Sequence, residues 1–219
     1  MAQTPSPRER RRIGAIFDRF AAAVPEPRTE LAHASPFTLL VSVVLSAQAT
    51  DASVNKATAA LYEVADTPAA MAALGEAGLI PFIASIGLYR TKARNVVGLS
   101  RLLIERHGGE VPLSREALEA LPGVGRKTAG VVLNELGAEA AIAVDTHVFR
   151  LARRLKLSAG KTPAAVEADL MRLVPPARLP RAHHWLILHG RYVCTARKPK
   201  CAACLIADLC PSRELFIGG

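Results

Sequence analysis

The sequence lacks any apolar run long enough to cross a membrane. Its longest apolar stretch covers residues 39–45 and contains Ser42, whereas a spanning helix needs about 20 apolar residues. Residues 1–12 are polar and basic with no hydrophobic segment, so no secretory signal is expected. Cysteine is absent before residue 194, which rules out a disulfide framework for most of the chain. These absences exclude membrane-spanning and disulfide-stabilised classes and predict a protein of the reducing cytoplasm.

Acidic residues are scarce relative to basic ones. The chain has 19 Asp and Glu against 28 Lys and Arg, a formal net charge of +9 and a pI near 9.9. A basic excess gathered on one face favours a polyanionic partner, whereas an excess spread evenly is ordinary solvated charge. Half of the 219 residues are hydrophobic, enough for one large or two small cores.

Signals for β-structure are also missing. No alternating runs are joined by a hairpin turn and helix caps recur instead, so the predicted fold class is all-α. The valines of residues 37–45 leave a buried strand as a weaker alternative for that segment. Gly75, Gly78 and Pro81 mark a looser region ahead of Gly87, with at most a short helix after Pro81. The other predicted helices cover about residues 7–24, 36–45, 51–61, 68–75, 91–107, 115–134 (a helix pair), 146–151, 163–174 and 180–192.

The chain is organised around residues 121–129, LPGVGRKTA, which join the helix pair. Pro122 stops the first helix, and Gly123 and Gly125 let the chain reverse through backbone conformations that strain other residues. The turn leaves backbone N–H groups pointing outward at the start of the second helix, which suits a phosphate oxygen. It lacks the length and the downstream acidic residue of a dinucleotide-binding turn. A phosphate-binding helix-hairpin-helix and an ordinary turn between helices both remain open on this motif alone.

Lys127 lies in the first turn of the second helix. The positive end of the helix dipole and the neighbouring Arg126 disfavour its protonated amine. An amine in such a position is a candidate nucleophile, although a phosphate clamp would also place a lysine here. Further along, Asp145 follows the apolar residues 140–144, which can be extended, and is placed to cap a helix through His147.

The four cysteines form one short segment near the C-terminus. Their spacing is C-x6-C-x2-C-x5-C, at Cys194, Cys201, Cys204 and Cys210. Four thiols so close together in a chain without secretion signals indicate a metal site. Structural zinc usually draws two close cysteine pairs and only one is present, so the spacing slightly favours an iron-sulfur cluster over zinc. The intervening Arg197, Lys198 and Lys200 predict a second phosphate contact.

Four motifs together resemble the endonuclease III family of helix-hairpin-helix DNA glycosylases. They are the hairpin LPGVGRKTAG, the later VDTHVFR, the segment LSAQATD at residues 45–51 and the cysteine spacing, and the resemblance runs from about Ser35 to Cys210. It implies a [4Fe-4S] cluster and a bifunctional DNA glycosylase and AP lyase of base excision repair. Such an enzyme removes damaged bases, with oxidised pyrimidines expected, and cleaves 3′ to the abasic site by β-elimination.

The resemblance also implies individual roles. Lys127 matches the family's nucleophile and Asp145 its catalytic carboxylate, although Asp145 can also simply cap its helix. Gln48 resembles the residue that fills the gap left by the extruded nucleotide, and Leu88 the wedge in the opposite strand. Without the family, Gln48 reads as a polar helix-end residue and Leu88 as a core leucine. The further DNA contacts expected are Gly123, Val124, Gly125, Arg126, Arg197, Lys198, Lys200 and His147. For His147 the alternative is a packing role without any contact to DNA.

The same resemblance implies two lobes. Residues 29–139 are expected to form a helical barrel domain containing the hairpin pair, and residues 1–28 with 140–219 a cluster domain. Double-stranded DNA carrying a damaged base or an abasic site is the expected partner, in a cleft between the lobes. We expect a monomer in the cytoplasm, associated with the nucleoid through DNA.

Two alternatives from other classes, and one from within the glycosylase superfamily, compete with this interpretation. A non-catalytic helix-hairpin-helix protein would use Lys127 only as a phosphate clamp. An electron-transfer protein would use the cluster, but would leave the hairpin and the basic charge without a purpose. An adenine-type mismatch glycosylase shares the cluster but typically lacks a lysine at this position and carries a further C-terminal domain.

Overall fold

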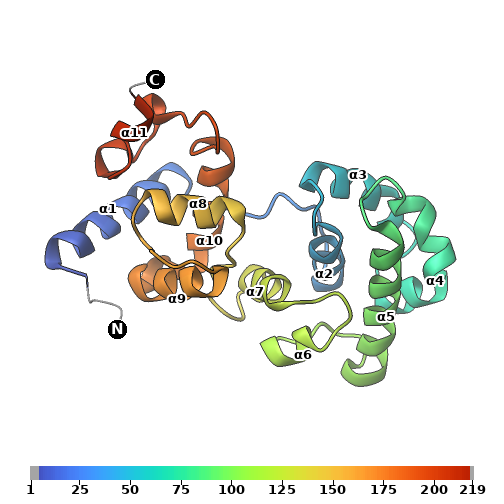
Figure 1. Cartoon of the computed structure of the whole chain (residues 1–219). Coiled ribbons are helices and arrows are strands. Elements are labelled where there is room, and N and C mark those ends of the chain that lie inside the picture. Colours follow the sequence, from blue (N-terminus) through green and yellow to red (C-terminus); the bar gives the residue numbers. More distant parts are fainter. Residues whose placement is uncertain (1–4, 218–219) are drawn as a thin grey trace. The chain divides into compact units, whose positions relative to one another are not determined.

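The computed structural model describes residues 5–217, and all regular secondary structure within that range is helical (Figure 1). The predicted all-α class is therefore confirmed. The α-helices are α1 (Pro7–Ala23), α2 (Pro36–Leu45), α3 (Asp51–Tyr62), α4 (Pro68–Ile83), α5 (Tyr89–His107), α6 (Arg115–Glu119), α7 (Arg126–Glu135), α8 (Thr146–Arg154), α9 (Pro163–Leu173), α10 (Leu179–Tyr192) and α11 (Glu214–Ile217). Three short 3₁₀ helices cover Pro176–Arg178, Cys201–Ala203 and Ala207–Leu209. Over residues 5–217, no helix is long and apolar enough to cross a membrane.

Side-chain caps fix where most helices begin. The hydroxyls of Ser6, Ser35 and Thr50 each accept a hydrogen bond from the backbone N–H three residues ahead. Each cap satisfies one of the N–H groups that a helix start leaves without a partner, which stabilises the helix by about 1 kcal/mol. At Ser35, a reciprocal bond with Thr38 completes a capping box, so residues 37–45 form a helix and not a strand.

The chain divides into two compact units, Thr29–Glu139 and Met1–Arg28 with Ala140–Gly219. In the first, α2 is buried on every side because all nine residues from Phe37 to Leu45 lie in the core, and α4 packs along α5. In the second, α1 and α8 to α10 surround a separate core that includes Phe17 and Trp185. The division leaves each unit with its own apolar interior.

The looser region expected after Gly75 is instead helical. Gly75 has φ +67° and kinks α4, but the chain resumes a helix through Pro81 to Ile83. A proline inside a helix costs about 3 kcal/mol because it removes a hydrogen bond and crowds the preceding turn. The fully buried Leu79 and Ile83 on this segment offset that penalty through their packing. α5 likewise starts at Tyr89, two residues before the predicted start.

Candidate functional site

The hairpin between α6 and α7 folds around one left-handed glycine. Gly123 has φ +77°, and a Cβ atom there would lie 2.8 Å from the side-chain amide of Asn95, so only glycine fits. Gly125 has φ −99°, so the expectation that both glycines need a left-handed backbone is wrong. A Cβ at Gly125 would meet nothing within 4 Å. Neither the backbone conformation nor the space around position 125 therefore requires glycine.

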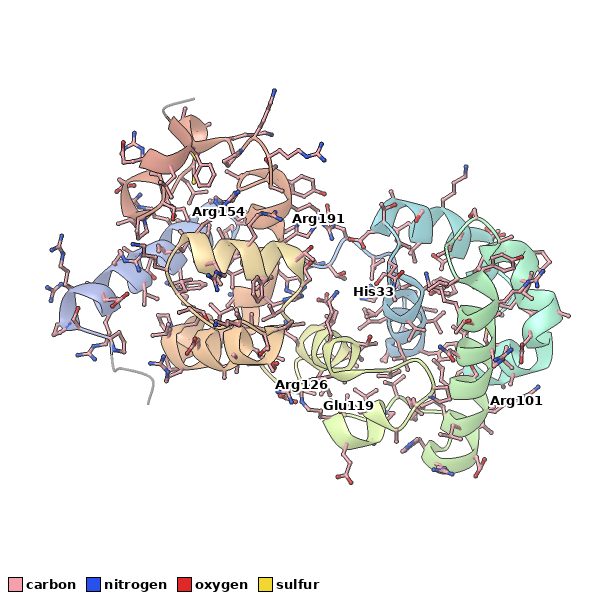
Figure 2. The ribbon with its side chains drawn as sticks, in the orientation of Figure 1. His33, Arg101, Glu119, Arg126, Arg154 and Arg191 are labelled. Carbon is pink, nitrogen blue, oxygen red and sulfur yellow. The ribbon has the colours of Figure 1, made fainter. Side chains whose placement is uncertain are left out.

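The N-terminus of α7 presents amides and cations to its surroundings. Gly125 is the N-cap residue, no side chain caps the helix, and no acidic residue lies in its first turn. Lys127 and Arg126 are exposed, while Ala129 and Leu133 are buried. Figure 2 shows Arg126 at the start of α7. The carbonyl of Arg126 accepts a hydrogen bond of 3.3 Å from Arg115. This arrangement offers N–H donors and an exposed amine to an anion.

Gln48 and Leu88 share an uncommon backbone conformation. Gln48 has φ 55° in the turn between α2 and α3, and Leu88 has φ 60° as the N-cap residue of α5. A bulky residue at positive φ is strained by about 1 to 3 kcal/mol, and such strain gathers at functional sites. Both side chains are exposed, Leu88 by 59 %. The alternative that Leu88 is a core leucine is therefore wrong.

Asp145 caps α8 with one of its two carboxylate oxygens. Its Oδ1 accepts hydrogen bonds of 2.8 Å from the N–H groups of both His147 and Val148, as the sequence predicted for a cap. Oδ2 accepts neither of these bonds. The residue follows the buried segment 141–144 and is itself half-buried. The helix thus holds the carboxylate in one orientation and leaves one oxygen for other chemistry.

Arg150 connects α8 to α10 and to the first cysteine. Its guanidinium donates to the carbonyls of Gly190, at 2.6 Å, and Cys194, at 3.0 Å, and lies 3.2 Å from Nδ1 of His147. A Cβ at Gly190 would come within 2.9 Å of the His147 carbonyl, so glycine permits this close helix contact. His147 is half-buried in this arrangement, and its contact with DNA stays a prediction.

The four cysteine thiols line a single cavity together with Leu151, Leu155 and Ile206. Burial raises the pKa of the Cys204 thiol, and the charges of Cys194, Cys210 and Cys201 raise it further. Nevertheless, no group of three or more Cys, His, Asp or Glu within residues 5–217 is arranged to hold one metal ion.

A cluster fits this arrangement better than zinc. A single zinc ion draws its sulfurs to about 2.3 Å from one point, whereas a [4Fe-4S] cubane is itself several atoms wide and holds its cysteines further apart. Four cysteines around one cavity are the set of ligands that a [4Fe-4S] cubane takes. The residues present therefore suit the [4Fe-4S] cluster that the sequence slightly favoured.

Arg154 is the main organising residue that the sequence analysis missed. Its guanidinium donates to the Cys194 sulfur at 3.3 Å and to the carbonyls of Thr195 and Ala196 at 2.7 and 2.9 Å. The ring of Phe216 stacks on it at 4.3 Å. Figure 2 shows Arg154 beside the C-terminal segment. The sequence offered one sign of this role, the pair Arg153-Arg154 at the end of a helix with an apolar face. Ordinary surface charge was the simpler explanation for that pair.

The basic loop between the first two cysteines is held at its base while its cations remain exposed. Thr195 Oγ1 donates to the Lys198 carbonyl at 2.6 Å, and the Lys200 N–H donates to the Val193 carbonyl at 3.0 Å. The side chains of Arg197, Lys198 and Lys200 are all exposed. The three cations can therefore contact a phosphate without any change in the backbone hydrogen bonds of the loop.

Removing the Phe216 ring is expected to shorten the lifetime of the cluster. Phe216→Ala deletes a cation–π contact of about 0.5 to 1 kcal/mol. Arg154 should therefore leave its place more often, and the cysteine loop that it binds should open more often. We expect the visible absorbance of the aerobic protein to decay roughly two- to fivefold faster. The control is Leu215→Ala, a neighbour that is 79 % exposed. If the absorbance of both variants decays at the same rate, the Phe216 ring does not help to retain the cluster.

The predicted residues divide between the units. Gln48, Leu88, the hairpin and Lys127 belong to Thr29–Glu139, whereas Asp145, His147, the basic loop and the cysteines belong to the other unit. One unit thus contains an uncapped helix start with a lysine, and the other contains an oriented carboxylate and a cysteine-lined cavity.

Comparisons with known proteins identify the relatives of this chain. The model of the helix-hairpin-helix (HhH-GPD) superfamily of base excision DNA repair proteins matches residues 41–176. The model of the iron-sulfur binding domain of endonuclease III matches residues 194–210. Endonuclease III of Escherichia coli K12 is 56 % identical over 199 residues, covering 91 % of this chain and 94 % of the relative. That of Treponema pallidum is 57 % identical, covering 90 % and 94 %.

Solved structures agree with these relatives. A structure of endonuclease III trapped in a covalent intermediate with DNA superposes with a TM-score of 0.87 at 43 % identity, covering 94 % of this chain and 97 % of that one. A thermostable thymine-DNA glycosylase shares the fold, with a TM-score of 0.82 at 23 % identity, covering 94 % and 98 %.

Proposed function

The chain belongs to the endonuclease III family, DNA-binding glycosylases and AP lyases of base excision repair with a [4Fe-4S] cluster, and from that premise we propose that Lys127 and Asp145 perform its chemistry. Lys127 Nζ forms a bond to C1′ of the sugar as the bond from C1′ to the damaged base breaks. The base leaves with its electron pair and takes up a proton. Asp145 stabilises the positive charge that develops on the sugar during this step.

The second half of the reaction follows from the amine. The bond between Lys127 and C1′ becomes a Schiff base once the sugar ring opens, and this iminium acidifies the proton at C2′. Loss of that proton expels the 3′ phosphate by β-elimination, which cuts the strand. Hydrolysis of the Schiff base then returns the free lysine. An arginine, which stays protonated, could not carry out these steps.

One observation carries the assignment of the nucleophile. Lys127 is exposed at the uncapped, cation-rich start of α7, beside amides that no side chain occupies. The chain uses only 7 lysines against 21 arginines, so a general need for positive charge does not explain a lysine here. The hairpin amides hold the phosphate and the amine meets the sugar.

We propose that the two turns with strained residues, Gln48 and Leu88, help to extrude the damaged base from the duplex. Removing a nucleotide from the stack costs a few kcal/mol, and less for a damaged base that pairs poorly. Gln48 is proposed to fill the vacated space and Leu88 to wedge the opposite strand. Their exposure and their positive φ support these roles. The proposed ligands of the [4Fe-4S] cluster are Cys194, Cys201, Cys204 and Cys210, and a cluster bound to them would hold the basic loop in place.

The proposed substrate is double-stranded DNA with an oxidised pyrimidine or an abasic site. We propose that the protein binds it as a monomer, in the cytoplasm and on the DNA of the nucleoid. The test is a panel of duplexes that each carry one lesion, scored separately for base release and for strand cleavage. We expect release and cleavage with oxidised pyrimidines. Release without cleavage, or activity confined to adenine mispairs, would overturn the proposal.

The basic loop is expected to contribute to the salt dependence of DNA binding. Lys198→Gln with Lys200→Gln removes two phosphate contacts, so the slope of log Kd against log salt should become shallower by about 2. Fluorescence anisotropy with an undamaged duplex measures this slope. The matched control is Arg8→Gln with Lys161→Gln, which removes two exposed charges of the same unit outside the loop. If both pairs change the slope equally, the loop is not a phosphate contact.

A further inference from the structure

One titratable group in the unit Thr29–Glu139 has no function in this mechanism and no partner. Lys92 on α5 is only 4 % exposed, and its Nζ is buried without a hydrogen bond among the described residues. Burial lowers the pKa of this amine. An unpaired buried amine destabilises a protein, because the water that solvated it is not replaced. A lysine kept in such a place needs an explanation beyond packing.

Lys92 lies one helical turn after the exposed Leu88. Its backbone N–H donates to the Leu88 carbonyl at 3.0 Å, the first hydrogen bond of α5. Side chains on a helix lean toward its N-terminus, so a lysine at this position is expected to direct its stem toward the Leu88 turn. The four-carbon stem can carry the amine outward by rotation about its own bonds. Such a movement breaks no hydrogen bond, because Nζ has none to break.

The start of α5 lacks the groups that normally neutralise a helix N-terminus. Leu88 provides no side-chain cap and the first turn contains no acidic residue. Arg90 and Arg94, both exposed, add positive charge within the first two turns, where the helix dipole already disfavours cations. Backbone amides, two arginines and a buried lysine without a partner together form a site that an anion would complete.

We propose that the N-terminus of α5 is a phosphate-binding site, in which Lys92 pairs with a DNA backbone phosphate beside the nucleotide that Leu88 displaces. The proposal rests on the proposed wedge role of Leu88. In the free protein the amine stays buried beneath the turn. When Leu88 enters the duplex, the adjacent phosphate arrives at the helix start and offers the acceptor that the protein itself lacks. Lys92 then positions the wedge instead of acting on the base.

Lys92→Met tests this because a pairing role and a packing role predict different combinations of effects. Methionine has a similar length and no amine, so the Tm of the free protein should rise by about 2 to 4 °C. Affinity for a lesion-containing duplex should nevertheless fall about tenfold, and the salt slope should become shallower by about 1. Binding is measured in the Lys127→Gln background, which removes turnover. Lys92→Arg keeps the charge and should retain the slope.

The control is Arg101→Met, an exposed cation of α5 that lies 13 residues beyond Leu88, or about 20 Å along the helix. It should change neither Tm nor affinity appreciably. Lys92→Met with unchanged affinity and slope would overturn the inference, as would a large loss of Tm in Lys92→Met with an unchanged salt slope. A wild-type protein that releases no base from any duplex would instead overturn the proposed function. Failure of the Lys92 inference and failure of the proposed function therefore give different results.

Discussion

Lys127→Gln is expected to abolish borohydride trapping and strand cleavage on lesion-containing DNA. The substitution removes the only group in the first turn of α7 that can form a Schiff base. Binding to the damaged duplex should change by less than about tenfold, because the hairpin amides remain and only one charge is lost. Trapping is measured as a covalent protein–DNA band after reduction, and peptide mapping of the wild-type adduct should place it on Lys127.

Lys127→Arg separates the nucleophile from its charge. Arginine preserves a cation at the exposed helix start and so should bind duplex as tightly as the wild type, yet it cannot form an imine. We expect no trapping and no cleavage with this variant either. Cleavage by Lys127→Arg at the wild-type rate, or an adduct on another lysine, would show that the chemistry belongs to a different amine.

The local parts of the fold were predictable because their causes are local. A serine or threonine before a proline, as at Ser35 and Thr67, satisfies a helix start with atoms only three residues away. The cap at Asp145 follows the same rule. Gly75 was correctly expected to interrupt a helix, because its left-handed backbone is a property of that residue.

The parts that failed depend on neighbours distant in the sequence. The helix through Pro81 persists because Leu79 and Ile83 are buried in a core that composition does not place. Arg154 organises the cluster loop through atoms about 40 residues away, and the buried amine of Lys92 reads in the sequence as ordinary surface charge. Gly123 requires glycine partly because Asn95 packs against it. No local pattern contains these contacts.

The site shows the same division. The spacing of the cysteines indicated a metal centre and only slightly favoured a cluster over zinc, whereas the match to the iron-sulfur binding domain of endonuclease III identifies the cluster. The sequence alone gave Gln48 and Leu88 ordinary structural readings. Their exposed side chains and positive φ, which no residue pattern predicts for Gln or Leu, are what support a functional role.

Asp145→Asn is expected to slow base release by roughly 10²- to 10³-fold, because it removes a negative charge that stabilises the developing charge on the sugar. The fold of α8 should survive, since asparagine caps a helix about as well as aspartate and can accept from the same His147 and Val148 N–H groups. Loss of the charge at the helix start costs about 0.3 to 1 kcal/mol, a fall in Tm of about 1 to 4 °C.

A pre-formed abasic site provides the internal control for this variant. There is no base to displace in such DNA, so the cleavage rate of Asp145→Asn should fall far less than its rate of base release under single-turnover conditions. Asp145→Ala, which removes both the charge and the cap, should lose about 1 kcal/mol more stability without slowing base release much further. If Asp145→Asn releases the base at the wild-type rate, the carboxylate only caps α8, and the charge on the sugar must be stabilised by another group.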